Sequence, residues 1–122
     1  MLEDGRVYIT GGRNQSLSPW TSTFDFRTNS WQQLENMNRG RWYPTTVAMA
    51  NGEVFTAIGS GGGQYPEVGA PGLGWTLLTG VDLNGPILNY TNHYERNWWP
   101  LLNLAPNGQI FHSGPTPRMH YI

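Results

Sequence analysis

The fold is decided by the stretch Met49-Ala-Asn-Gly-Glu-Val-Phe-Thr-Ala-Ile-Gly59, which the chain repeats in related form. The other two copies are Leu2-Glu-Asp-Gly-Arg-Val-Tyr-Ile-Thr-Gly-Gly12 and Leu104-Ala-Pro-Asn-Gly-Gln-Ile-Phe-His-Ser-Gly114. Asp-Gly or Asn-Gly flanked by alternating apolar residues is the strongest short-range hairpin signal, and its two-residue turn is type I′, with positive φ at both central residues. We therefore predict hairpin turns at Asp4-Gly5, Asn51-Gly52 and Asn107-Gly108.

The spacing of these turns matches the blades of a β-propeller. Asp4 and Asn51 are 47 residues apart, and Asn51 and Asn107 are 56 apart, close to the length of a four-stranded blade. A second marker follows the first two turns, because Phe24 and Trp31 are seven residues apart, as are Val68 and Trp75. Each of these pairs indicates a strand, a tight turn and a second strand that opens on Trp.

A coarse order of strands follows from the pattern. We expect strands near residues 6–11, 21–26, 31–34, 44–49, 53–58, 75–78 and 109–113. The stretch 59–74 holds nine Gly or Pro in sixteen residues, which predicts a long irregular connection. Residues 87–99 lack Gly and Pro and carry apolar side chains at helical spacing, which predicts a short helix.

The order of hairpin, Gly pair, aromatic residue and Trp resembles the kelch repeat. The stretch from Asn38 to Phe55, together with Pro106–Pro115, is similar to the kelch propeller of galactose oxidase and glyoxal oxidase, and Arg41-Trp-Tyr-Pro44 narrows the resemblance to the copper radical oxidases. The resemblance implies an all-β fold of antiparallel kelch-like blades. It also implies that residues 1–122 form a single partial β-propeller of about two to three blades.

Composition and charge exclude several classes of protein. Charged residues make up 12% of the chain, about half the usual share of roughly 25%, which argues against a charged helical bundle. The net charge is −1 and the seven basic residues, all Arg, are scattered, so we expect no nucleic-acid partner. The sequence shows no export signal and no apolar run long enough to span a bilayer. We expect no membrane partner, and the localisation stays open, although members of the resembling family are often secreted.

Tyr43 is the residue to which the resemblance gives a catalytic role. In the resembling oxidases this Tyr is a copper ligand, is bonded to a Cys of an earlier blade and carries a radical, while a Tyr-His pair and a further His lie in later blades. This chain has no Cys, so the crosslink cannot form within it. A copper site needs several ligands at one point, so we expect no cofactor in the isolated chain, and copper only if the remaining ligands come from elsewhere. The alternative is that Tyr43 packs beside Trp42 and Pro44.

Tryptophans beside amide side chains offer a second kind of site. The candidates are Trp20, Trp42, Trp98 and Trp99. Aromatic faces and amides together suit the binding of sugar rings. Packing between blades is the alternative for these tryptophans.

The histidines and carboxylates indicate no separate catalytic site. The histidines are His93, His112 and His120. A zinc-type site needs three or four ligands, and the sequence places no such set together. We therefore expect these histidines to be ordinary strand or loop residues and not metal ligands. The carboxylates, among them Glu67, are far apart in sequence and form no local pair for glycosidase chemistry.

The length of the chain is short for a propeller. Closed propellers have four to eight blades, whereas 122 residues make about two and a half at this spacing. Open sheet edges would remain, and the chain has no Lys, the residue that most often protects such edges. We expect it to associate with copies of itself or with missing blades. Three functions stay open: a non-catalytic, self-associating propeller segment, a carbohydrate-binding module, and part of a copper radical oxidase with Tyr43 as a ligand.

Overall fold

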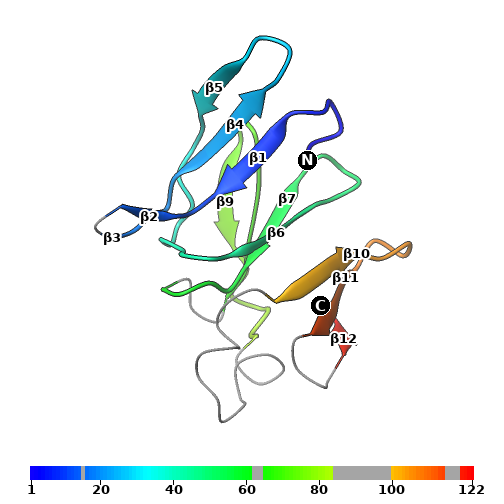
Figure 1. Ribbon diagram of the computed structural model, residues 1–122. Helices are drawn as coiled ribbons and strands as arrows, with labels where there is room; N and C mark the ends of the chain where they lie inside the picture. Colours follow the sequence, from blue (N-terminus) through cyan, green and yellow to red (C-terminus); the bar gives the residue numbers. More distant parts are fainter. Residues whose placement is uncertain (15, 62–64, 84–99, 115–118) are drawn as a thin grey trace.

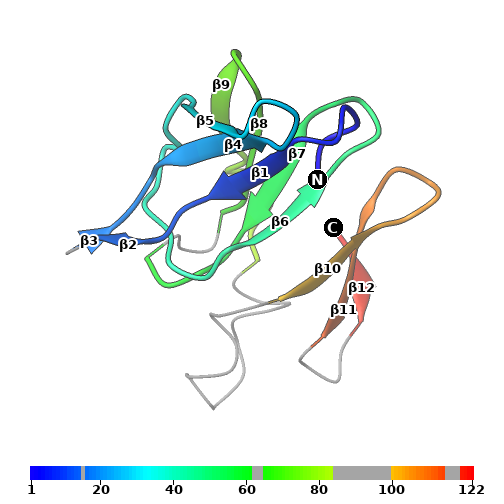
Figure 2. The same ribbon diagram turned by 45° about the horizontal axis from the view of Figure 1, so that its top comes forward.

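The computed structural model describes residues 1–14, 16–61, 65–83, 100–114 and 119–122. The larger antiparallel sheets formed by these residues lie side by side, and each of them corresponds to one blade (Figures 1 and 2). The predicted all-β, partial propeller fold is therefore confirmed. No helix in these ranges is long and apolar enough to cross a membrane.

The first blade has three strands, β1 (Val7–Thr10), β4 (Thr21–Asp25) and β5 (Ser30–Gln33), in the order β1-β4-β5. Between β1 and β4 the chain forms a side hairpin from β2 (Arg13–Asn14) and β3 (Ser16–Leu17), which projects to the left in Figure 1. The sequence pattern did not predict this hairpin.

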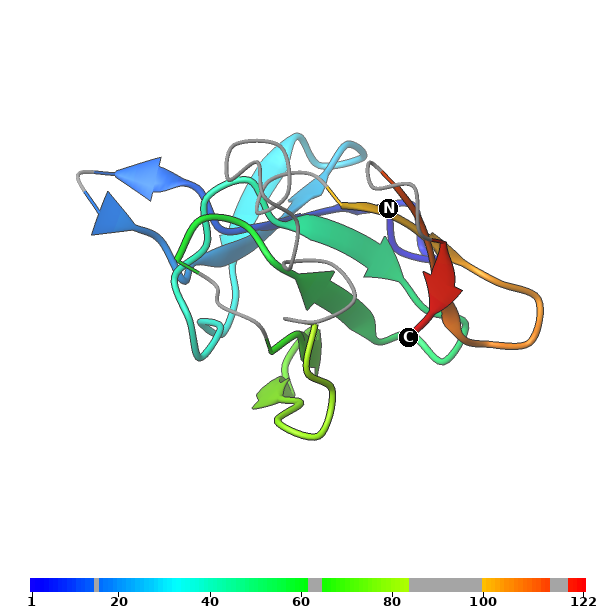
Figure 3. The same cartoon turned by 90° about the horizontal axis from the view of Figure 1, so that it is seen from below.

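The second blade is a complete four-stranded meander. Its strands are β6 (Thr45–Ala48), β7 (Val54–Ala57), β8 (Glu67–Ala70) and β9 (Gly74–Leu77), paired in chain order. Every residue of β7 is buried, because this strand lies inside the blade and the blade lies between the other two sheets (Figure 3).

The third blade consists of β10 (Leu101–Leu104), β11 (Ile110–Gly114) and β12 (His120–Tyr121). It packs on the second blade through a core cluster that includes Phe55, Ala57, Leu102 and Ile110. The core of the molecule is therefore the interface between two blades.

The repeated turns share one geometry, shown here for the turn between β6 and β7. The amide of Met49 donates to Glu53 O at 2.8 Å, and the amide of Gly52 donates to Met49 O at 3.2 Å. Asn51 Oδ1 accepts the amide of Glu53 at 3.1 Å. The turns at Gly5 and Gly108 repeat these contacts.

The turn type differs from the type I′ prediction. Gly5, Gly52 and Gly108 have φ of 86°, 83° and 85°, whereas Asp4, Asn51 and Asn107 are not among the residues with positive φ. Because the amide of Met49 donates to Glu53 O, the turn between these two residues is three residues long, with Gly52 at the left-handed bulge position.

The predicted strands can be compared directly with the structure. All seven predicted regions overlap a strand. The long irregular connection predicted over 59–74 is wrong, because β8 lies within it and pairs with both β7 and β9. The high Gly content indicated a loop, but Gly69 is a strand residue that leaves space for an indole. A Cβ at Gly69 would lie 2.6 Å from Cδ2 of Trp75. The helix predicted over 87–99 lies outside the described residues.

Candidate functional site

Tyr43 lies just before β6 in an unusual backbone conformation. Its φ is 59°, in the left-handed region that bulky residues avoid, and Pro44 follows it, although a residue before proline favours extended conformations. Its side chain is 39% exposed. A strained residue of this kind costs on the order of 1–3 kcal/mol and persists only where the surrounding structure enforces it.

The segment that contains Gly59 and Ser60 enforces this conformation through a tight backbone contact. Trp42 and Ser60 form an isolated antiparallel bridge, with N to O distances of 3.0 and 2.8 Å. A Cβ at Gly59 would lie 2.8 Å from both Trp42 O and Pro44 N, so only glycine fits beside Tyr43.

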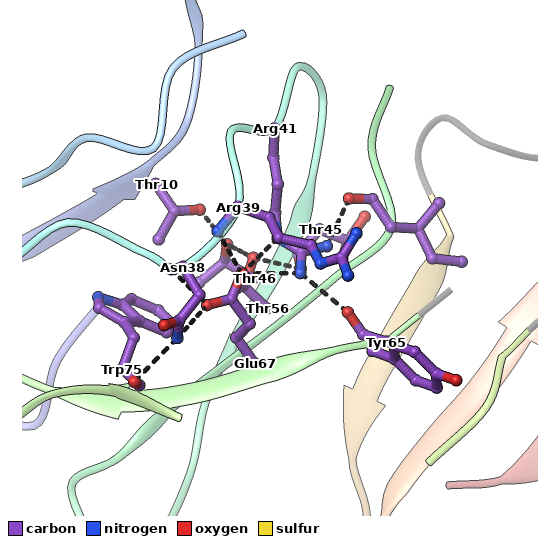
Figure 4. A network of polar contacts seen from close by, with 11 residues as sticks. Thr10, Asn38, Arg39, Arg41, Thr45, Thr46, Thr56, Tyr65, Glu67 and Trp75 are labelled. Atoms are coloured by element: carbon purple, nitrogen blue, oxygen red, sulfur yellow. Dashed lines mark hydrogen bonds and ion pairs between the residues drawn. The ribbon is translucent and has the colours of Figure 1, made fainter. Parts of the chain in front are cut away.

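A buried ion pair anchors both sides of this contact (Figure 4). Arg41 Nη2 lies 2.9 Å from Glu67 Oε1, and neither side chain is exposed. Arg41 also donates from Nη1 to Ile58 O at 2.8 Å and from Nη2 to Tyr65 O at 2.9 Å. One guanidinium therefore ties the segment before Tyr43 to the segment that packs against it.

Both carboxylate oxygens of Glu67 accept hydrogen bonds from the segment that precedes Arg41. Its Oε2 accepts hydrogen bonds from the amide of Asn38 at 2.7 Å and from Asn38 Nδ2 at 2.9 Å, and its Oε1 accepts the amide of Arg39 at 3.2 Å. Burial lowers the pKa of the Arg41 guanidinium, while Glu67 opposes that shift. The pair satisfies the charges that burial would otherwise leave uncompensated.

The side chain of Tyr43 stacks on its neighbour. The rings of Trp42 and Tyr43 lie 4.4 Å apart between centroids, with an interplanar angle of 28°. The packing that the sequence suggested as an alternative role for Tyr43 is therefore present, while the ring also keeps contact with solvent.

The other predicted site residues lie apart from this network. Trp20 is 50% exposed, immediately before β4. His112 is fully buried on β11, and its ring lies 4.8 Å from that of His120 on β12. His93, Trp98 and Trp99 lie outside the described residues.

The described residues do not fit a complete metal centre. They contain no group of three or more His, Cys, Asp or Glu close enough to hold a metal ion. Tyr43 offers a single oxygen, whereas a copper site needs several ligands at one point. A copper site that includes Tyr43 would need ligands from outside these residues.

Comparison with known proteins agrees with this fold. A kelch-motif family model matches residues 4–38. Two galactose oxidases of Gibberella zeae are each 30% identical over 125 residues, covering 97% of this chain and 18% of the relative. The chain thus carries a kelch motif, has antiparallel kelch-like blades and resembles galactose oxidase over nearly its whole length. The predicted resemblance is confirmed.

A solved structure also resembles this kelch-type segment. It is described as a fungal alcohol oxidase of the AA5 family in complex with copper, and it matches with a TM-score of 0.83 and 28% identity, over 98% of this chain and 25% of that one. The kelch-type segment thus spans a minor part of each relative.

Sequence reasoning missed the anchor of the site. The sequence relates Glu67 only to other carboxylates, whereas its partner in the structure is the guanidinium of Arg41, 26 residues earlier. A signal was present, since Glu67 stands between Pro66 and Val68 in a chain with few charges. An isolated charge among apolar residues indicates a buried, paired group.

Proposed function

We propose that this kelch-type segment is not catalytic by itself and contributes Tyr43 as one copper ligand of an alcohol oxidase whose other ligands lie outside these 122 residues. The similarity to galactose oxidase and to a copper-containing alcohol oxidase supports this function. The single observation that carries it is the conformation of Tyr43, which is strained, anchored and still 39% exposed.

The residues of this chain would position the phenol. The ion pair of Arg41 and Glu67 holds the segment that precedes Tyr43. Gly59 allows the facing segment to approach the backbone on both sides of Tyr43. Trp42 covers one face of the Tyr43 ring. Because these supports are buried or stacked, the direction of the phenol is set before any metal arrives, which lowers the cost of binding.

A segment exchange tests this function. The matching 18% of the Gibberella zeae galactose oxidase is replaced by this chain, so that the host supplies the remaining ligands. The chimera is loaded with copper, and peroxide formation from galactose is measured together with the copper content and circular dichroism spectrum.

We expect peroxide formation in the chimera and its loss to background in Tyr43→Phe. Tyr121→Phe is the matched control, because Tyr121 is also an exposed tyrosine but lies in the third blade. Retained activity in Tyr43→Phe would overturn the proposal. So would a folded, copper-loaded chimera that produces no peroxide.

Carbohydrate binding is a second candidate, favoured by the half-exposed indole of Trp20. Its test is titration of intrinsic tryptophan fluorescence with galactose and galactose-containing oligosaccharides. A saturable change that disappears in Trp20→Ala, and persists in Trp31→Ala, is expected. Trp31 is a suitable control because it is 62% exposed. A response unaffected by Trp20→Ala, or no response, would exclude this function for Trp20.

A further inference from the structure

The second blade places an isoleucine where the other two blades place a glycine. The sixth residue after the turn glycine is Gly11 in the first blade, Ile58 in the second and Gly114 in the third. Their φ values are 72°, 59° and 147°, so the repeat has a positive φ at this position. Glycine adopts such a backbone readily, whereas a β-branched residue there is an outlier. The isoleucine of the second blade is therefore strained, and the surrounding structure must hold it in place.

Two strained residues meet at the Tyr43 site. Among the described residues, the non-glycine residues with positive φ are Asn29, Tyr43 and Ile58. Asn29 lies in the turn between β4 and β5, and asparagine tolerates this conformation in turns. The other two are linked by Arg41, which precedes Tyr43 by two residues and donates from Nη1 to Ile58 O at 2.8 Å. Strained backbone of this kind clusters at functional sites.

The side chain of Ile58 stabilises its strained backbone. Ile58 is 1% exposed and belongs to the core cluster between the second and third blades, with Leu102 and Ile110. Burying an aliphatic side chain of this size contributes more free energy than a left-handed backbone costs. The packing of Ile58 therefore offsets its strain, and a smaller side chain that keeps a Cβ would leave the strain without compensation.

The backbone of Ile58 carries this constraint to the Tyr43 site. Its carbonyl oxygen accepts a hydrogen bond from the buried guanidinium of Arg41. The two residues that follow, Gly59 and Ser60, contact the backbone beside Tyr43. A return of Ile58 to negative φ would turn its carbonyl away from Arg41 and displace both of these residues. Ile58 thus connects the core between two blades with the conformation of Tyr43.

We propose that Ile58 is a positioning residue for Tyr43. Its buried side chain holds a left-handed backbone, and that backbone keeps its carbonyl on Arg41 and keeps Gly59 against the segment that presents the phenol. A role in filling the core alone would not depend on the backbone at position 58. The effect on Tyr43 follows from the contacts within this chain, whereas its consequence for an oxidase rests on the function proposed above.

Replacement by alanine and by glycine separates positioning from packing. Ile58→Ala and Ile58→Gly remove nearly the same core contacts, but only Ile58→Gly also removes the strain. Hydrogen exchange measured by NMR reports on the site through the amides of Trp42 and Ser60, which donate to each other's carbonyl groups. We expect these amides to exchange roughly tenfold faster in Ile58→Ala than in Ile58→Gly, the factor that corresponds to the strain of one left-handed residue.

Near-ultraviolet circular dichroism gives a second readout of the same site. The stacked rings of Trp42 and Tyr43 should give a band that is absent from Tyr43→Ala. We expect this band to be retained in Ile58→Gly and weakened in Ile58→Ala. A residue that only filled the core would not keep the band on replacement by glycine and lose it on replacement by alanine.

Val54 supplies the matched control. It is also 1% exposed and β-branched, and it lies in β7 with an ordinary backbone, because its φ is not positive. Glycine in a strand is less stable than alanine, so Val54→Ala should be more stable in urea than Val54→Gly, and position 58 should show the reverse order. Should Ile58→Ala fail to fold, Ile58→Val keeps the strain and loses part of the packing, so it should still exchange the two amides faster than the wild type.

Equal exchange of the two amides in Ile58→Ala and Ile58→Gly would overturn the positioning role. So would a band weakened as much in Val54→Ala as in Ile58→Ala, because loss of packing alone would then explain it. The galactose oxidase chimera tests the consequence for activity: Ile58→Ala should lower kcat more than Ile58→Gly does, with KM for galactose unchanged. If every chimera is inactive while the amides follow the expected order, the proposed function fails and the positioning role stands.

Discussion

The guanidinium of Arg41 and the carboxylate of Glu67 lie 2.9 Å apart, and neither side chain reaches solvent. Replacing a buried pair by apolar residues can be neutral, whereas removing one partner leaves an uncompensated charge and costs about 3–5 kcal/mol. Here Glu67 also accepts the amides of Asn38 and Arg39, so the pair links folding of the second blade to the segment that presents Tyr43.

We expect Arg41→Met to lower the free energy of unfolding by about 3–5 kcal/mol, because it leaves the Glu67 carboxylate buried without its cation. Urea unfolding followed by tryptophan fluorescence measures this change. Arg27→Met is the matched control: Arg27 pairs with Asp25 at 2.9 Å, but its side chain is 53% exposed, and solvent screens such a pair. Its unfolding midpoint should stay close to that of the wild type. Equal losses in the two variants would contradict the assignment of Arg41 as a buried anchor.

A second prediction concerns the backbone of Tyr43. With φ at 59°, any residue with a Cβ is strained there, by about 1–2 kcal/mol. Tyr43→Gly and Tyr43→Ala both lose the stacking on Trp42, but only Gly relieves the strain. We therefore expect Tyr43→Gly to be more stable than Tyr43→Ala by about 1 kcal/mol, measured by urea unfolding. An Ala variant as stable as the Gly variant would show that the conformation at this position is not strained.

The repeat was readable from sequence because it rests on local chemistry. The spacing of Phe24 and Trp31 predicted two strands joined by a turn, and these residues are direct partners across β4 and β5. Val68 and Trp75 have the same spacing, yet Trp75 pairs with Gly69 instead. The turn between β8 and β9 is one residue shorter, since Ala70 pairs with Gly74 whereas Asp25 pairs with Ser30. Sequence spacing located the hairpin but not its register.

The site could not be predicted in the same way, because its anchors come from distant parts of the chain. The left-handed conformation of Tyr43 contradicts the local preference before Pro44 and follows from the contact with Gly59. The partner of Glu67 is Arg41, which the turn of the blade brings to it. Resemblance to the oxidases singled out Tyr43, and only the tertiary structure shows how it is held.

The contact between Gly69 and Trp75 gives a third prediction. A Cβ at Gly69 would lie 2.6 Å from both Gly74 O and Trp75 Cδ2, and such overpacking costs about 1–3 kcal/mol. Gly69→Ala should therefore lower stability in urea and change the near-ultraviolet circular dichroism of the indole. Gly80→Ala is the matched control, because nothing lies within 4 Å of a Cβ there and its φ is not positive. A neutral Gly69→Ala would mean that the Trp75 ring moves away without loss.

The last prediction concerns pH and rests on Tyr8, which meets Trp75 between the first two blades. Burial raises the pKa of the Tyr8 hydroxyl above its usual value of 10.0, and the charge of Glu35 adds to that shift. The unfolded chain therefore ionises at this residue before the folded chain does. The stability that Tyr8 contributes is complete below about pH 10 and is lost as the pH rises through the pKa of the folded state. We expect the melting temperature to fall less steeply above pH 10 in Tyr8→Phe than in the wild type, measured by circular dichroism at closely spaced pH values. Parallel curves for the two proteins would contradict the raised pKa and, with it, the burial of this hydroxyl between the blades.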